Sequence, residues 1–111
     1  MHERVTFGKI EPGRLEEFRN VWNEELFPVL RAVTGNWREL MFEREDEAGR
    51  VVYFSVWHDK KYADRFDELW GFERVFAALR PFFVEGPDTR IFQTVGYNRP
   101  LVPLSNKFKP R

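Results

Sequence analysis

Hydrophobic residues in this chain either alternate with polar ones or run together in four short stretches, and each stretch predicts a β-strand. The most apolar stretch is 51–57, in which every residue is β-branched, aromatic or small, as in a strand buried on both faces. Glycine, proline and acidic residues mark turns at 11–13 and 46–49 and a loop at 85–88. The expected strands are therefore 5–10, 37–44, 50–57 and 89–97.

Two regions repeat apolar residues at steps of three and four, which is the spacing of one helix face. The first runs from 14 to 33 and contains Pro28, which removes one backbone hydrogen bond and should kink the helix. The second begins after Asp59, a suitable N-cap, and a shorter helical piece over 72–79 follows it. The inner positions are Leu15, Phe18, Trp22, Leu26, Val29 and Val33 in the first region and Tyr62, Phe66, Leu69 and Trp70 in the second.

The order of these elements is β-α-β-β-α-β, which predicts an α+β, ferredoxin-like fold with a four-stranded antiparallel sheet and both helices on one face. Residues 1–97 would form this domain, and 98–111 would form an extended or disordered tail. The other face of the sheet is too apolar to remain in water, so we expect a homodimer that buries about 800 Å² per partner. The residues at risk of exposure on that face are Leu40, Phe42, Val52, Phe54 and Val56.

Composition narrows the class of protein. The chain has 111 residues, enough for one domain with one core, and no cysteine, which excludes disulfides, thiolate metal sites and cysteine nucleophiles. Its 18 basic and 18 acidic residues cancel, and no apolar run approaches a membrane span, so we expect a cytoplasmic protein without nucleic-acid or membrane partners. Aromatic residues make up 17% of the chain, which favours a dimer interface, a ligand cavity or both.

One face of the 50–57 strand carries Tyr53, Ser55 and Trp57, because alternate residues of a strand share a face. Trp57 offers an apolar plane and one N–H donor, and Ser55 could bind a small polar ligand. These residues are candidates for a pocket wall, with plain core packing as the alternative. The same two interpretations apply to the aromatic residues Trp22, Phe66, Trp70 and Trp37.

His58 and Arg38 are the candidates for a polar or basic group at the site. His58 could act as a base near neutral pH, although it alternates away from the Trp57 face, and a solvent-facing or interface histidine is the more frequent case. We place the other histidine, His2, at the terminus, and two histidines so far apart predict no metal site. Arg38 could hold an acidic ligand, or it could pair at the surface with Glu39, Glu43 or Asp88.

Four short motifs recur in a characteristic order between about 5 and 95. They are Ile10-Glu11-Pro12-Gly13-Arg14, Gly35-Asn36-Trp37, Val56-Trp57-His58-Asp59-Lys60-Lys61-Tyr62 and Arg90-Ile91-Phe92. In this order and spacing the chain resembles the antibiotic biosynthesis monooxygenase family of the dimeric α/β-barrel superfamily. The resemblance implies a homodimer whose sheets pack face to face, and a cavity between sheet and helices in each subunit.

The resemblance also assigns meaning to single positions. The junction tryptophan of the family, here Trp57, lines or borders the cavity, and polyketide-modifying members have an asparagine four residues earlier, where this chain has Tyr53. Many members carry a histidine in the next helix, where this chain reads Arg65-Phe66-Asp67. The haem-degrading branch has an asparagine where Thr6 stands here and a histidine ligand without a counterpart, so we set haem oxygenation aside and expect no cofactor.

Two hypotheses of function remain open. The first is cofactor-independent oxygenation of a small aromatic, quinol-like substrate, whose anion would transfer an electron to O₂. The second is a non-catalytic homodimer of the same fold that binds a small ligand or has a structural role. A cavity filled by the chain's own phenylalanine and tryptophan side chains would favour the second hypothesis.

Overall fold

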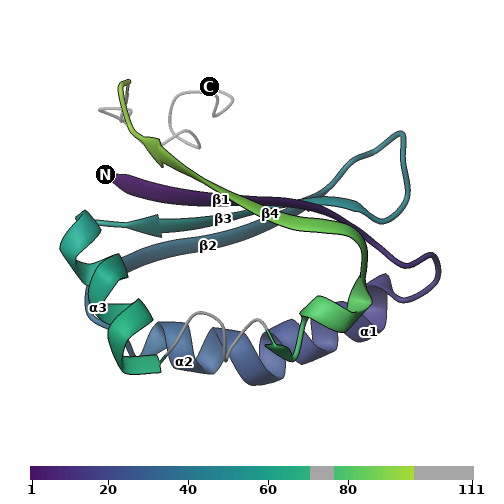
Figure 1. Ribbon diagram of the computed structural model, residues 1–111, viewed down its shortest axis with the longest axis horizontal. Helices are drawn as coiled ribbons and strands as arrows, with labels where there is room; N and C mark the ends of the chain where they lie inside the picture. Colours follow the sequence, from purple (N-terminus) through teal and green to yellow (C-terminus); the bar gives the residue numbers. More distant parts are fainter. Residues whose placement is uncertain (71–76, 97–111) are drawn as a thin grey trace, which may run out of the picture.

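An antiparallel sheet of four strands forms one layer of the protein, and the helices form the other (Figure 1). The computed structural model describes residues 1–70 and 77–96. The strands are β1 (His2–Ile10), β2 (Asn36–Glu43), β3 (Arg50–Trp57) and β4 (Phe83–Gln93). They lie in the order β2-β3-β1-β4, with antiparallel neighbours throughout, which confirms the predicted ferredoxin-like α+β fold.

The helical segments of the described chain cover one face of this sheet and leave the other bare (Figure 1). They are α1 (Leu15–Val21), the π-helical turn η1 (Trp22–Leu26), α2 (Phe27–Arg31), α3 (Lys60–Trp70) and the 3-10 turn η2 (Arg80–Phe82). The Lys61 amide donates to Asp59 Oδ1 at 3.1 Å, so Asp59 caps α3 as the sequence predicted. None of the helices in the described ranges has both the length and the apolar character needed to cross a bilayer.

The pleat of β3 divides the molecule into two sides. Arg4 and Thr6 of β1 stand opposite Ser55 and Tyr53 of β3. This row of side chains faces the helices, since Arg4 donates a hydrogen bond to Asp67 of α3. The intervening residues of the same strands therefore point to the bare face.

The core fills the space between the sheet and the helices. Trp57, at the end of β3, is 1% exposed, and its ring centroid lies 5.6 Å from that of Phe66 on α3. Full burial of a large apolar side chain stabilises the fold by about 1.5–3 kcal/mol. The largest of the fully buried side chains are Trp57, Phe66, Ile10, Leu26 and Leu79.

The kink predicted at Pro28 takes the form of a π-helical turn. The Phe27 amide donates to the carbonyl of Trp22, five residues back, so η1 is wider than an ordinary α-helical turn. Pro28 follows in the first turn of α2. The backbone N–H that proline lacks is not needed there for a hydrogen bond within the helix. The helical path therefore continues past the proline to Arg31 instead of breaking there.

The last strand begins earlier than predicted. β4 starts at Phe83, runs through 85–88, which we predicted to be a loop, and ends at Gln93. Its pairing with β1 shifts register on both sides of Lys9, and such an irregular ladder tolerates a proline that a regular one excludes. Gly8 makes room for this path, because a Cβ there would lie 2.5 Å from the Phe83 ring. The predicted tail at 98–111 and most of the helical piece at 72–79 lie outside the described residues.

We expect Gly35→Ala to lower the free energy of unfolding by about 3 kcal/mol. Gly35 has a φ of +87°, which an L side chain rarely adopts, and an added Cβ would also collide with the Tyr62 ring. Gly13→Ala is the matched control, because Gly13 has a φ of +82° and nothing within 4 Å of the added atom. It should cost only about 1 kcal/mol in urea unfolding. Equal losses at the two positions would show that the Tyr62 contact does not matter.

Candidate functional site

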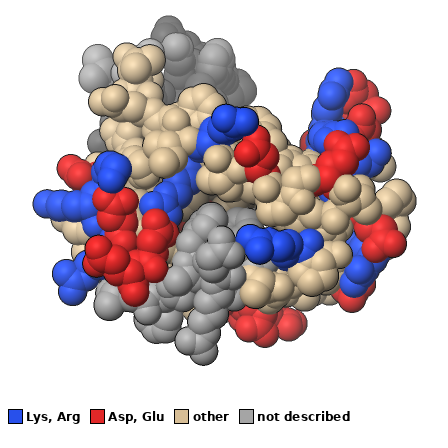
Figure 2. Space-filling model, viewed as in Figure 1, with Lys and Arg blue, Asp and Glu red and all other residues tan. Residues whose placement is uncertain are grey.

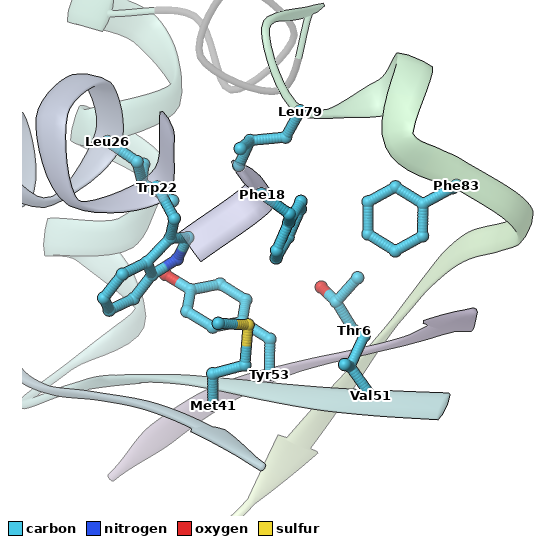
Figure 3. Close-up of a pocket in the computed structure, with 9 residues that line it drawn as sticks. All are labelled: Thr6, Phe18, Trp22, Leu26, Met41, Val51, Tyr53, Leu79 and Phe83. Carbon is cyan, nitrogen blue, oxygen red and sulfur yellow. The ribbon is translucent and has the colours of Figure 1, made fainter. Parts of the chain in front are cut away.

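A small cavity lies between the first helical segments and the helix-facing side of the sheet (Figure 3). The space open to the centre of a water molecule inside it is about 10 Å³, which accommodates one water at most. A ligand the size of an aromatic ring therefore needs wall residues to move. The wall consists of Thr6, Phe18, Trp22, Leu26, Met41, Val51, Tyr53, Leu79 and Phe83.

Aromatic rings from four different elements meet around this cavity. Phe18 of α1 contacts Phe83 of β4 edge-on at 5.5 Å between centroids, and Trp22 of η1 contacts Tyr53 of β3 edge-on at 5.9 Å. Each such pair contributes about 0.5–1.5 kcal/mol beyond burial. Met41, which is unbranched and has several rotatable bonds, is the most adaptable part of the wall.

A chain of hydrogen bonds lies on the same face of the sheet, and we call its members the polar cluster. The Trp57 indole N–H donates to Ser55 Oγ at 3.0 Å, and the Ser55 hydroxyl donates to Glu39 Oε1 at 2.9 Å. The Asn36 amide donates to the same Glu39 oxygen at 3.2 Å. The pairing of β2 with β3 causes this arrangement, because it sets Glu39 opposite Ser55. The other oxygen, Glu39 Oε2, is buried and has no hydrogen-bond partner among the described residues.

Tyr53 connects the cavity to the polar cluster. Its ring lines the cavity, and its hydroxyl lies beside the indole nitrogen of Trp22 (Figure 3). Burial raises the pKa of Tyr53 well above its usual value, and the charge of Glu39 raises it further, while Ser55 and Trp22 lower it by less. The Trp22 N–H is itself buried and makes no hydrogen bond of ordinary geometry within the described chain. An unused donor thus lies next to the Tyr53 hydroxyl.

Burial raises the pKa of Glu39 from 4.5 to about 8, because the carboxylate loses its hydration there. The neighbouring Tyr53 hydroxyl and the hydrogen bonds from Ser55 and Asn36 stabilise the carboxylate and oppose part of that rise. At neutral pH the group is therefore mostly a carboxylic acid, and it ionises slightly above neutrality. A buried acid that titrates near neutral pH beside a cavity is a candidate proton donor or acceptor.

Arg4, which lies on the other side of β3 from Glu39, interacts with α3. Arg4 stands opposite Ser55, is 7% exposed, and donates to both carboxylate oxygens of Asp67 at 2.7 Å. This bidentate pair joins β1 to α3. Glu39 has no ion-pair partner within residues 1–70 and 77–96. Burial rather than a counter-ion therefore controls its protonation.

The structure places the predicted pocket residues in different surroundings. Tyr53 and Trp22 line the cavity. Ser55 and Trp57 are buried in the polar cluster, where Ser55 bonds Glu39 instead of facing open space. Phe66 packs against Trp57 at the α3 end of the core.

The remaining candidates lie away from the cavity. Trp37 is 41% exposed, contrary to its predicted place in the wall, because the register of β2 shifts between Asn36 and Arg38 and turns it outward. His58 is exposed, with its ring centroid 6.2 Å from that of Trp37, and the Arg38 guanidinium lies 5.7 Å from the same indole. The Trp70 side chain lies outside the described part of the chain.

The sequence analysis did not anticipate the buried carboxyl oxygen of Glu39 or the burial of His2. Glu39 was expected only as a surface partner for an arginine, although it precedes Met41 by two residues and so shares its inward face. His2 was placed at the terminus, but it belongs to β1 and is only 8% exposed. Its Nε2 is buried without a partner in the described ranges, and burial, together with the Arg4 charge, lowers its pKa.

Fold and site together define a small α+β domain with a narrow, aromatic-walled cavity and a buried acid beside it. No family model and no curated protein matches this sequence. Solved structures do match. SnoaB, a cofactor-independent oxygenase from Streptomyces nogalater, has a TM-score of 0.72 at 19% identity, over 86% of this chain and 94% of that one.

Two further structures show the same likeness. A candidate antibiotic biosynthesis monooxygenase from Nitrosomonas europaea has a TM-score of 0.71 at 16% identity, over 86% of this chain and 100% of that one. Rv0793 from Mycobacterium tuberculosis has a TM-score of 0.71 at 13% identity, over 88% of this chain and 98% of that one. The resemblance predicted from sequence motifs is confirmed in the fold: this chain has the fold of the antibiotic biosynthesis monooxygenases.

We expect the free energy of unfolding to fall by on the order of 4 kcal/mol between about pH 5 and pH 9 because of Glu39. Its pKa is about 8 in the folded protein against 4.5 as the ordinary value, so the folded state retains a proton that the unfolded state releases. The stabilisation is complete below the lower value and is lost as the pH rises through the higher one. Urea unfolding across this range measures it.

Glu39→Gln should remove most of that pH dependence and should be more stable than the wild type at the alkaline end. Glu45→Gln is the control, because Glu45 is an exposed glutamate of the β2–β3 turn and should follow the wild-type curve. A Glu39→Gln curve parallel to the wild-type curve would place the carboxyl in contact with solvent.

Proposed function

We propose that this protein oxygenates a small, quinol-like aromatic substrate without a cofactor, in the cavity between η1 and the sheet. The observation that carries the proposal is an aromatic-walled cavity that has the buried Tyr53 in its wall, with the carboxyl of Glu39 next to Tyr53. The likeness in fold to SnoaB, a cofactor-independent oxygenase, supports the same reaction class. The polar groups suit a substrate that must lose a proton inside an apolar site.

The chemistry requires an anion that can reduce O₂. For an anthrone-like substrate, the ring methylene loses its hydrogens and becomes a carbonyl, whose oxygen comes from O₂, while the second oxygen atom leaves as water. All electrons come from the substrate. An apolar wall withholds hydration from the anion, and the unused Trp22 N–H is a donor for its oxygen.

Substrate entry requires the wall to open. Because the resting space is about 10 Å³, side chains such as Met41 and Trp22 must change rotamer to admit a ring. Both side chains are only partly buried, and Trp22 is the first residue of the widened turn η1. These rotamer changes therefore leave the central strands in place.

Oxygen uptake tests this function directly. We expect the protein to accelerate O₂ consumption with at least one member of a panel of hydroquinones and anthrones in metal-free buffer. Trp22→Phe should slow the reaction at least about tenfold, because it removes one donor to the developing charge. Trp37→Phe is the control, since Trp37 is exposed and away from the cavity. No turnover above background across the panel would overturn the assignment.

The small volume of the cavity favours a second candidate function. It is a non-catalytic homodimer of this fold that binds a small ligand or has a structural role. The same panel separates the two. Binding detected by a change in tryptophan fluorescence, without O₂ uptake, would identify the second function.

We also propose that the bare face of the sheet is covered by a second copy of the chain. Phe7, Phe42 and Phe92 come from three strands of this face and are 43%, 51% and 47% exposed. In Figure 2 the charged side chains gather mainly over α3 and around the β2–β3 turn, with a few others between them. Exposed aromatic side chains gathered on one sheet face are typical of an interface between subunits.

The residues predicted for this face differ in how far they are exposed. Phe42 is exposed, and Leu40, Val52 and Phe54 are half-buried. Val56 is only 4% exposed within the single chain, contrary to the expectation. It lies between Glu3 and Arg38 in the register of the sheet, and so neighbouring side chains flank it.

Adjacent positions on β4 provide a test of the dimer. Phe92 pairs with Glu3 and points to the bare face, whereas Ile91 pairs with Arg4 on the helix side and is 65% exposed. Phe92→Asp should convert a dimer into a monomer at micromolar concentration, because a charge would be buried without a partner. Ile91→Asp should remain dimeric. Light scattering that reports a monomeric wild type would contradict the proposal.

A further inference from the structure

We propose that the small cavity between η1 and the sheet, in its resting form, is a binding site for dioxygen, which occupies it before the aromatic substrate enters. The inference rests on the proposed function in one respect, that the reaction consumes O₂. It adds the place where this second substrate binds. The supporting observations are the volume of the cavity, the chemistry of its wall and the positions of the wall residues that can move.

The volume of the cavity excludes a ring and admits a diatomic molecule. The space open to the centre of a water-sized molecule is about 10 Å³. Dioxygen is only slightly larger than water, so it fits with the wall residues in place, whereas an aromatic ring does not. Of the two substrates of the proposed reaction, O₂ is therefore the one that matches the resting cavity.

The wall suits an apolar molecule better than water. Nearly all of the wall surface that the described residues present to a small molecule in the cavity is carbon or sulfur. The Thr6 hydroxyl is hydrogen-bonded to the Thr89 hydroxyl at 2.8 Å, and the Trp22 N–H is buried with almost no accessible surface. A buried water needs roughly two to four polar partners, so water gains little in this space. O₂ is apolar and has no such requirement.

Dispersion contacts with the wall stabilise a bound apolar molecule. Phe18, Val51 and Leu79 are buried and line the cavity, so their positions are fixed by the surrounding core. Atoms next to a void lack contacts on the open side, and a molecule in the void restores those contacts. The polarisable sulfur of Met41 adds to the attraction. Apolar cavities of proteins bind xenon for the same reason, and O₂ belongs to the same class of ligand.

The movable residues lie together on one side of the cavity (Figure 3). Trp22 and Met41 are partly buried, Trp22 contacts Tyr53 edge-on, and Met41 stands opposite Tyr53 in the sheet. Phe18 and Phe83 are on the other side and contact each other at 5.5 Å between centroids. Outward rotation of Trp22 and Met41 makes room for a ring beside the original space, which stays available to O₂. The two substrates then lie next to each other.

Xenon is the probe for the site, because it is apolar, inert and about as large as O₂. Under xenon pressure, the full-length protein should show shifts of the methyl resonances of four residues that line the cavity, which are Leu26, Met41, Val51 and Leu79. Val51→Ile should weaken xenon binding at least about tenfold, because the added carbon occupies the space. Val51→Ala should strengthen xenon binding, because the void becomes larger.

Val52 provides the matched control. It follows Val51 in β3, pairs with Phe7 and Phe42, and points to the bare face. Val52→Ile and Val52→Ala therefore make the same chemical changes outside the cavity, and both should leave xenon binding at the cavity methyl groups unchanged. Urea unfolding of each variant separates loss of the site from loss of the fold.

The role of the site in the reaction is tested with the aromatic compound that gives O₂ uptake. In Val51→Ile, KM for O₂ should rise at least about tenfold, while KM for the aromatic compound should change less than about twofold. An unchanged KM for O₂ in a Val51→Ile protein that no longer binds xenon would overturn the assignment of this cavity to O₂.

The xenon experiment also separates this inference from the proposed function. Absence of xenon binding to the wild type, or shifts confined to residues of the bare face, would overturn the site. Equal effects of the Val51 and Val52 substitutions would overturn its location. Xenon binding in the cavity without O₂ uptake for any compound of the panel would reject the proposed oxygenation and support the site for small apolar molecules.

Discussion

The pleat of β3 is the constraint on which the rest of this structure depends. Its inward residues meet three different partners: Trp57 packs on α3 through Phe66, Ser55 holds Glu39 of β2, and Tyr53 faces η1. A slip of one residue between β2 and β3 would exchange the two faces of β2 and carry Glu39 to the bare side. The antiparallel register is thus what converts a local alternation of residue types into an enclosed acid beside an apolar cavity.

The acid and the cavity influence each other through solvent. Burial keeps water from the carboxyl group of Glu39, and this lack of hydration, not a neighbouring anion, shifts its pKa upward. Tyr53 belongs to both environments, since its ring is part of the wall and its hydroxyl is at the polar cluster. A change in the packing of the wall therefore alters the proton affinity of the cluster. The position of Tyr53 therefore couples the packing of the cavity wall to the protonation of the polar cluster.

Local patterns in the sequence were sufficient to predict the order of the elements, the fold and which residues of β3 face the helices. The alternation that grouped Tyr53, Ser55 and Trp57 depends only on the strand period, and the register bears it out. Glu39 was missed because a charged residue is exposed by default, and only the pairing of β2 with β3 shows that Ser55 and Asn36 bind it.

Departures from ideal geometry account for the other errors. Trp37 was expected in the wall by simple alternation, but a register shift in β2 breaks the period just there. The 85–88 segment has the composition of a loop, and it enters β4 only because the missing side chain of Gly8 lets β1 accept an irregular partner. Neither effect is visible in a single stretch of residues, since each depends on two strands meeting.

The widened turn at Trp22–Leu26 has a consequence for the spacing of the buried helix residues. Phe18, Trp22, Leu26 and Leu30 are separated by steps of four, and all are at least partly buried. In a continuous α-helix, three such steps would rotate the last side chain by about 120° from the first. The extra residue in the π turn takes up part of that rotation. Buried residues can therefore recur at every fourth position of this helical region and still lie on one continuous face against the sheet.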